Sequence, residues 1–577
     1  MTKHDQLVEN LAKHLQKQLE GQRGETQTPS PPGETASDAS VSIIRTHISS
    51  VILAGEYAYK IKRAVKFAFL DFSTLDKRQA QCLRELAVNQ RAAPQIYLDV
   101  LPITGSTASP ALNGSTGPVI EWALKMRRFE TGMLLSELAR DGQLSSPQIE
   151  DLARYLARFH LTSPIISVND LTQGDRRPAH KTTQQWLLES LNEIEACLQP
   201  ETPSGTRGSA YDTKILIEQI DALRTETSKA WDETLALRTA RQAQGWVREC
   251  HGDLHLNNIT LSHGQPVIFD AIEFNDDLRQ IDLVNELAFP FMDLLAHGLS
   301  DLAWTLINEY EQVIGDYRGL ALLKYYTRYR AIVRAKVALL TQKVDDRDHG
   351  AQTYAFQRYW EIALNPPFGT RPAPLILVAG LSGSGKSTVA RMLSRQIGAV
   401  WLRADFERKR LFPETDSERR YSPEATDLTY KQLEQHAHEL LNAGLSVVID
   451  ATFLDKKQVA RFEALSLTAS NKRRPHALGN LILIVCESDR SVMQDRITQR
   501  RQTGIDPSEA SVEVLQRQVS QIRSDGEPWP ATALRIVNNG SLQALQSTVT
   551  RLVSGLNDKR LAGTDQAHFS VDNPQRT

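Results

Sequence analysis

Residues 380–388 read GLSGSGKST and stand between the apolar run LILVA and a segment of helical periodicity that begins at Lys386. Glycines in such a loop let successive backbone N–H groups turn toward phosphate oxygens, at the positive end of the following helix. Lys386 would reach the β- and γ-phosphates, and the Ser387 hydroxyl would coordinate Mg²⁺. The motif predicts an ATP-binding loop and constrains this part of the chain to an α/β fold. The predicted nucleotide-binding residues are Gly380, Leu381, Ser382, Gly383, Ser384, Gly385, Lys386, Ser387 and Thr388.

Beyond residue 374, strand-like and helical segments alternate, and the strand-like runs are LILVA, AVWLRAD, LSVVIDAT, LILIVCE and ALRIVNN. This alternation predicts a parallel sheet with helices on both faces. The preceding segment NPPFGTRPAP disfavours both helix and sheet because of its prolines and glycine. We therefore expect a linker at 363–374, a P-loop domain at 375–558 and a flexible tail at 559–577.

Four side chains of this domain are candidates for chemistry. Asp405, in RADFERKR, is expected where a strand ends near the γ-phosphate, and it could accept a hydroxyl proton or hold Mg²⁺ through water; the alternative is a helix cap followed by a solvated basic helix. Asp450 follows three apolar residues, as a metal-binding Walker-B acid does. Arg496 and Arg500 precede a Gly/Pro loop and could close over the phosphates as a mobile lid, although a solvated basic helix end would have the same sequence.

These features resemble the small P-loop kinases that phosphorylate hydroxyl groups, including gluconate, shikimate and polynucleotide kinases. The resemblance covers about residues 374–555. It favours phosphoryl transfer to a hydroxyl over mechanical ATPase work, with Lys386, Asp405, Arg496 and Arg500 as catalytic residues and Ser387 with Asp450 as metal ligands.

A second constellation lies in the first half, where residues 251–258 read HGDLHLNN and an apolar strand leads to Asp270 in IFDAIEF. Kinase-like transfer uses an aspartate beside the acceptor hydroxyl, an amide five residues later that holds metal, and a second aspartate that bridges Mg²⁺ and the phosphates. Asp253, Asn258 and Asp270 have this spacing. The alternative is a capped loop without chemistry.

Such a site also needs a lysine on a strand and a glutamate on the next helix, because that ion pair orients the α- and β-phosphates. Lys60, in YAYKIKR, and Glu85, in CLRELAVNQ, are the candidates. Lys62 shares the strand face of Lys60 and could take its place. A surface lysine on an edge strand would look the same.

The first half is similar to the aminoglycoside phosphotransferase family, the small-molecule branch of the protein-kinase-like fold, over residues 42–362. Together the halves resemble bacterial proteins in which such a domain is fused to a P-loop kinase or AAA-type ATPase domain. The resemblance implies an N-terminal α+β kinase-like fold and a C-terminal α/β P-loop fold, with Asp253 catalytic and Asn258 and Asp270 binding metal. Residues 1–41 are expected to form a helix and a disordered linker that starts near residue 21. Nothing in the sequence identifies an aminoglycoside as the acceptor.

Composition gives no support to several other classes, although local basic patches remain possible. The formal net charge of −2 gives no case for bulk binding to nucleic acid or membrane. The four cysteines lack the CxxC spacing of zinc sites, which favours a reducing, cytoplasmic location. The sequence contains no uncharged apolar run of about 18 residues, so no membrane span is predicted.

We therefore expect a two-site phosphotransferase that uses ATP and Mg²⁺ and transfers the γ-phosphoryl group to a small hydroxylated acceptor, with ATP hydrolysis also possible. One alternative is a regulatory protein whose kinase-like half senses ATP and controls the P-loop half. Another is a nucleic-acid 5′-hydroxyl kinase, suggested by the basic run NKRRPH at 471–476. The sequence names neither acceptor and leaves the oligomeric state open.

Overall fold

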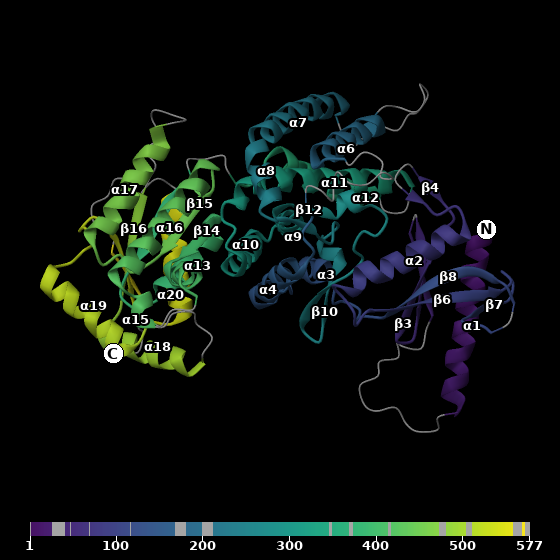
Figure 1. Cartoon of the computed structure of the whole chain (residues 1–577), viewed down its shortest axis with the longest axis horizontal. Coiled ribbons are helices and arrows are strands. Elements are labelled where there is room, and N and C mark those ends of the chain that lie inside the picture. The colour runs from purple at the N-terminus through teal and green to yellow at the C-terminus, as the bar shows by residue number, and fades with distance from the viewer. Residues whose placement is uncertain are drawn as a thin grey trace. The chain divides into compact units, whose positions relative to one another are not determined.

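The structure is a computed structural model, and it describes residues 2–25, 41–46, 48–67, 70–115, 117–167, 181–198, 212–344, 349–368, 373–413, 417–471, 481–503, 510–557 and 568–571. The chain divides into two compact units (Figure 1). The first contains Met1–Trp186 and Leu235–Asp293, and the second contains Leu187–Thr234 and Leu294–Thr577. Each unit is described by itself.

The first unit contains a six-stranded sheet with the strand order β1-β2-β3-β8-β6-β7, and every pairing in it is antiparallel. Helix α2 (Leu75–Gln90) lies beside β8 and β6 (Figure 1). The strands are β1 (Ser42–Arg45), β2 (Ser49–Ala54), β3 (Tyr57–Lys62), β6 (Tyr97–Gly105), β7 (Pro110–Leu112) and β8 (Val119–Arg127).

Helix α1 (Lys3–Glu25) lies against this sheet (Figure 1). Its leucines recur every four positions, so Leu7, Leu11 and Leu15 share one helix face and pack on Ile61 and other sheet residues. Residues 21–25, predicted as the start of the linker, belong to α1 instead. These residues read GQRGE, and because no proline interrupts them the helix continues through both glycines.

The remainder of the first unit contains helices, short strands and 3-10 turns, and the strands form two-stranded sheets. Strands β10 and β11 pair antiparallel, as do β12 and β9. Helices α6 (Thr183–Leu198) and α9 (Leu283–Ala296) cross the unit boundaries. The other elements are β4 (Lys66–Phe67), β5 (Leu70–Asp71), α3 (Leu135–Arg140), α4 (Ser146–Thr162), α8 (Leu235–Ala243), β9 (Val247–Glu249), η2 (Leu256–Asn258), β10 (Ile259–Ser262), β11 (Gln265–Ile268), η3 (Asp276–Leu278) and β12 (Gln280–Asp282).

The second unit contains a six-stranded, wholly parallel sheet with the order β14-β15-β13-β16-β17-β18. This confirms the parallel sheet predicted from the alternating pattern. Helices α13 and α20 pack on one face through a core that includes Val389, Leu393 and Val549. The strands are β13 (Leu375–Ala379), β14 (Ala399–Arg403), β15 (Ser446–Asp450), β16 (Leu481–Glu487), β17 (Leu534–Asn538) and β18 (His568–Val571).

Two features of this unit differ from the sequence-based expectations. Strand β18 lies inside the segment 559–577 that was expected to be a flexible tail, and it pairs with β17. The helices of the P-loop region are α13 (Lys386–Ile397), α14 (Ala404–Leu411), α15 (Ser417–Arg420), α16 (Pro423–Asn442), α17 (Lys456–Asn471), α18 (Arg490–Thr503), α19 (Val512–Asp525) and α20 (Leu542–Asn557). The second unit also begins earlier in the chain than expected, so the linker expected at 363–374 lies within the unit and not before it. The earlier elements of the unit are α7 (Thr213–Glu233), α10 (Ser300–Ile314), η4 (Gly319–Leu322), α11 (Leu323–Val344) and α12 (His349–Leu364).

None of the helices in the described ranges combines the length and the apolar character that crossing a membrane requires.

Candidate active sites

The loop that carries Asp253 follows β9 and is fixed by its backbone. Gly252 has φ +89°, and a Cβ there would meet the Leu278 carbonyl oxygen at 2.7 Å, so only glycine fits. The buried carboxylate of Glu286 accepts from the backbone N–H groups of His251 and Gly252, at 2.5 Å and 3.1 Å. Glu286 therefore holds this loop through its backbone.

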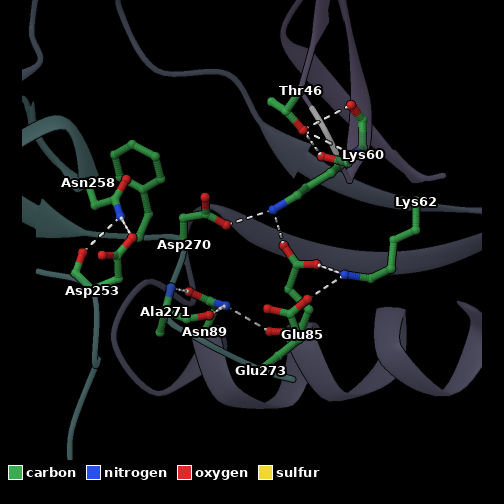
Figure 2. Close-up of polar contacts among 12 residues, drawn as sticks. Thr46, Lys60, Lys62, Glu85, Asn89, Asp253, Asn258, Asp270, Ala271 and Glu273 are labelled. Carbon is green, nitrogen blue, oxygen red and sulfur yellow. Dashed lines mark hydrogen bonds and ion pairs between the residues drawn. The ribbon is translucent and has the colours of Figure 1, made fainter. Parts of the chain in front are cut away.

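Asp253 and Asn258 lie together, as their spacing predicts. Asn258 Nδ2 donates to the backbone oxygen of Asp253 at 2.9 Å and to its Oδ2 at 3.2 Å (Figure 2). His255 Nε2 lies 3.3 Å from the same Oδ2. The Asp253 side chain is 38% exposed, so its carboxylate remains accessible from solvent.

Asp270 follows β11 and adopts an unusual backbone conformation, with φ +63°. Its backbone N–H donates to the Tyr97 hydroxyl at 2.9 Å. The next residue, Ala271, donates its N–H to Asn89 Oδ1 of helix α2 at 2.8 Å. A strained backbone that neighbouring groups hold in place is typical of functional sites. Here it turns the carboxylate of Asp270 toward β3.

Lys60 of β3 joins Asp270 to helix α2. Its Nζ lies 2.7 Å from Glu85 Oε1 and 2.6 Å from Asp270 Oδ1 (Figure 2). Burial alone would lower the pKa of Lys60, but the carboxylates of Asp270, Glu85 and Glu273 raise it well above its usual value. The lysine is therefore a fixed positive charge beside a partly exposed aspartate.

Lys62 occupies the same strand face and shares Glu85 with Lys60, but its second partner is Glu273 instead of Asp270. Its Nζ donates to Glu85 Oε2 at 2.6 Å and to Glu273 Oε1 at 2.5 Å (Figure 2). Burial would raise the pKa of Glu85, yet the two lysines lower it to about 2. Because Lys62 is 2% exposed and pairs with Glu85 and Glu273, whereas Lys60 pairs with Asp270, Lys60 is the better candidate for contact with phosphate.

The P-loop connects β13 to α13 and depends on close approaches by other elements. Gly385 has φ +89°, and a Cβ there would come within 2.1 Å of Asn538 Nδ2. That amide donates to the Ser384 carbonyl oxygen at 3.1 Å. The backbone N–H of Ser382 donates to Gln518 Oε1 of α19 at 2.9 Å. Asn538 and Gln518 thus support the loop, although neither was identified from the sequence.

Asp450 ends β15 beside the P-loop, where it was predicted. The residue is 4% exposed, and burial raises its pKa while Lys386, Arg403 and a hydrogen bond from Ser387 act in the opposite direction. Ser387 and Asp450 offer a hydroxyl and a carboxylate oxygen, as Asn258 and Asp270 offer amide and carboxylate oxygens in the first unit. Both sets are the oxygen donors that Mg²⁺ prefers.

Asp405 is not at a strand end as predicted. Strand β14 ends at Arg403, and Asp405 lies in the first turn of α14. Acidic residues in a first turn interact favourably with the positive end of the helix, which accounts for a helix that begins before Asp405 instead of after it. The helix that follows is not wholly solvated either, because Arg408 is buried.

Arg496 also differs from its predicted place on a mobile lid. It lies in the middle of α18, where Nη1 donates to Ser488 Oγ at 3.2 Å and to the Gly383 carbonyl oxygen at 3.4 Å. Nη2 donates to Asn538 Oδ1 at 3.4 Å. These contacts tie the arginine to the P-loop itself. The loop at 504–509 lies outside the described residues, as does nearly all of the basic run at 471–476.

Two cavities meet the P-loop. One of about 360 Å³ is lined by Gly385, Lys386, Arg496, Arg500 and Asn538, among others. The other, of about 830 Å³, is lined by Lys386, Asp405, Arg408, Asp450 and further residues of α16, α17 and α19. Lys386 lines both, so it lies where the two spaces adjoin.

Comparisons with known proteins give a separate family match for each half of the chain. A model of the phosphotransferase enzyme family matches residues 58–296, and a model of an AAA domain matches residues 375–524. An uncharacterized protein of Mycobacterium tuberculosis (strain ATCC 25618 / H37Rv) is 27% identical over 468 residues, which cover 80% of this chain and 86% of that protein.

Two solved structures are each similar to part of the chain. Choline kinase from Cryptosporidium parvum Iowa II covers 62% of this chain and 96% of its own, with 11% identity and a TM-score of 0.36. APS kinase from Mycobacterium tuberculosis covers 32% of this chain and 98% of its own, with 18% identity and a TM-score of 0.23.

Proposed function

Because a model of the phosphotransferase enzyme family matches residues 58–296 and a model of an AAA domain matches residues 375–524, we propose that this chain is an ATP-dependent phosphotransferase with two nucleotide sites. The predicted fusion of a phosphotransferase-like domain with a P-loop domain is confirmed, and so are both fold classes. The acceptors, the use of two ATP molecules and the role of each residue belong to the proposal.

The position of Lys386 between two cavities carries the proposal for the P-loop site. The cavity with Arg496, Arg500 and Asn538 would hold the nucleotide, and the larger cavity with Asp405 would hold the acceptor. A γ-phosphoryl group bound at the P-loop would then face both. A phosphate site that opens to a second, roomy space suits transfer to another molecule better than simple hydrolysis.

The chemistry follows from the side chains around these cavities. Asp405 would accept the proton of the acceptor hydroxyl, whose oxygen forms a bond to the γ-phosphorus while the bond to the β–γ bridging oxygen breaks. Lys386 would balance the negative charge that shifts onto the leaving oxygen. Ser387 and Asp450 would hold Mg²⁺, which neutralises charge on the β- and γ-phosphates when bound.

The first unit would supply the second site. The Lys60–Glu85 pair would orient the α- and β-phosphates, and Asp270 with Asn258 would hold Mg²⁺. Asp253 would take the proton of a second acceptor hydroxyl. Asp253 would therefore mark the acceptor end of this site, and the Lys60–Glu85 pair would mark its phosphate end. Asn258 contacts Asp253 and would hold the metal between the two ends.

Purified full-length protein, incubated with labelled ATP and a pool of small hydroxylated compounds, should yield labelled products. Lys386→Ala and Asp253→Asn should each remove a different product. Labelled products that persist in both variants would contradict the proposal. ATP binding in the first unit without any Asp253-dependent product would favour the regulatory alternative, and products confined to added oligonucleotides would favour the nucleic-acid alternative.

A further inference from the structure

Helix α10 carries buried polar side chains that need partners. The helix follows the phosphotransferase-family match and precedes the segment 363–374, yet it belongs to the same compact unit as the P-loop. Asn308 and Gln312 are 3% and 7% exposed. Buried amides of this kind are retained where they hydrogen-bond. Both find their partners at strand β14.

Asn308 closes the open edge of the parallel sheet. Strand β14 is the edge strand, with β15 on its other side. Asn308 Nδ2 donates to the Ala399 carbonyl oxygen at 3.0 Å, and its Oδ1 accepts from the Trp401 N–H at 2.8 Å. A neighbouring strand would pair with the same kinds of backbone group. The Asn308 side chain therefore fixes helix α10 against the free edge of β14.

Gln312 lies one helical turn beyond Asn308 and is held at both ends of its carboxamide. Its Nε2 donates to the Asn308 carbonyl oxygen at 3.3 Å, and its Oε1 accepts from Arg403 Nη1 at 3.0 Å. The first bond orients the amide group so that its oxygen faces Arg403. The glutamine is therefore preorganised as an acceptor for that guanidinium.

Arg403 extends from this contact toward the phosphate site. Its Nε lies 3.9 Å from Asp450 Oδ2. Its Cζ lies 4.6 Å from the ring centroids of both Trp401 and Phe406. The two rings limit where the guanidinium can move, and Gln312 fixes its far side. Asp450 in turn lines the larger cavity together with Lys386.

The C-terminal end of α10 is fastened to the same region. Arg410 Nη2, from α14, donates to the carbonyl oxygens of Glu311 and Gln312 at 3.1 Å and 3.2 Å. The chain then leaves the helix through Gly315, at φ +76°. Arginine bonded to the last carbonyls is a common way of ending a helix. The Gln312 side chain thus contacts β14, and the backbone carbonyl groups of Glu311 and Gln312 contact α14.

We propose that Gln312 is a positioning residue for the P-loop site, which keeps Arg403 beside Asp450. The inference rests on the proposed function, because it concerns phosphoryl transfer at that site. It also extends the catalytic unit upstream: the P-loop enzyme includes α10 and does not begin at the segment 363–374. Gln312 touches neither nucleotide nor acceptor and acts through Arg403.

The test measures Lys386-dependent ATP turnover in the full-length chain. In Gln312→Leu, which keeps the size of the side chain and removes the acceptor, kcat should fall about tenfold while the KM for ATP changes less than about twofold. Gln312→Glu restores an acceptor oxygen and should recover kcat to within about twofold of the wild type. Val313→Ala, on the same helix and 41% exposed in the wild type, is the matched control and should behave as the wild type.

If Gln312→Leu lowers the melting temperature, Gln312→Asn is used as the test variant instead. The shorter asparagine side chain keeps the amide group but cannot reach Arg403. Its kcat should fall without loss of thermal stability, and combining it with Arg403→Lys should give a smaller loss than the sum of the two. Wild-type kcat in Gln312→Leu and Gln312→Asn, or additive losses in the double variant, would overturn the inference alone. Wild-type ATP turnover that is unaffected by Lys386→Ala would overturn the proposed function and the inference with it.

Discussion

Lys62 Nζ lies 2.5 Å from Glu273 Oε1, in a pair whose side chains are 2% and 6% exposed. Lys62 also bonds Glu85, the partner of Lys60 (Figure 2). When ATP and Mg²⁺ bind at the proposed first site, Lys60 and Asp270 must turn from each other toward phosphate and metal. Lys62 and Glu273 would then keep Glu85 in place, because their own contacts do not depend on the ligand.

Lys62→Met should therefore destabilise the first unit strongly. Removing one member of a buried ionic cluster leaves uncompensated charge, which costs about 3–5 kcal/mol. The control is Lys77→Met, which breaks an exposed pair with Asp71 and should leave stability almost unchanged. Denaturant unfolding of both variants measures the difference. Equal, small effects would show that the cluster contributes little.

The pH dependence of stability should report the charge of Glu85. Its pKa is lowered from 4.5 to about 2 in the folded chain, so the stabilisation it gives is present above pH 4.5 and is lost as the pH falls toward 2. Between pH 4.5 and 3 this corresponds to a loss of about 2 kcal/mol. The melting temperature of the wild type should fall over that range, and Glu85→Gln should fall less. Parallel curves for the two proteins would contradict the assignment.

Gly385→Ala should abolish nucleotide binding at the P-loop. The added Cβ would meet Asn538 Nδ2 at 2.1 Å and would also require an alanine at φ +89°. Gly298→Ala is the matched control, because Gly298 has a similar φ of +75° but open space around its Cβ position. In fluorescence titration with an ATP analogue, Gly385→Ala should lose one of the two nucleotide sites, whereas the control variant should keep both. Equal binding by both variants would refute the role of this close approach.

Much of the fold could be predicted from the sequence because local patterns carry it. The alternation of apolar runs and helices specifies the parallel sheet, and GLSGSGKST fixes where the loop leaves β13. The pairing of Lys60 with Glu85 followed from motif spacing. Asp405 and Arg496 were placed less well, because a strand end and a helix end are set by a few residues whose tertiary contacts override the local pattern.

The residues that sequence reasoning missed all act across long separations. Asn538 supports the P-loop from β17, Gln312 reaches Arg403 from α10, and Glu273 meets Lys62 from beyond β11. No spacing rule connects such positions in a single sequence. Glu273 alone left a local signal, since it is an acid three residues after Asp270 in an otherwise apolar segment.

The most direct test of the two-site account is the stoichiometry of nucleotide binding. Equilibrium dialysis of the full-length chain with a labelled non-hydrolysable ATP analogue and Mg²⁺ should give two molecules bound per chain, with Lys60→Met and Lys386→Ala each reducing this to one. A single bound molecule in the wild type, or loss of all binding in either variant, would contradict it.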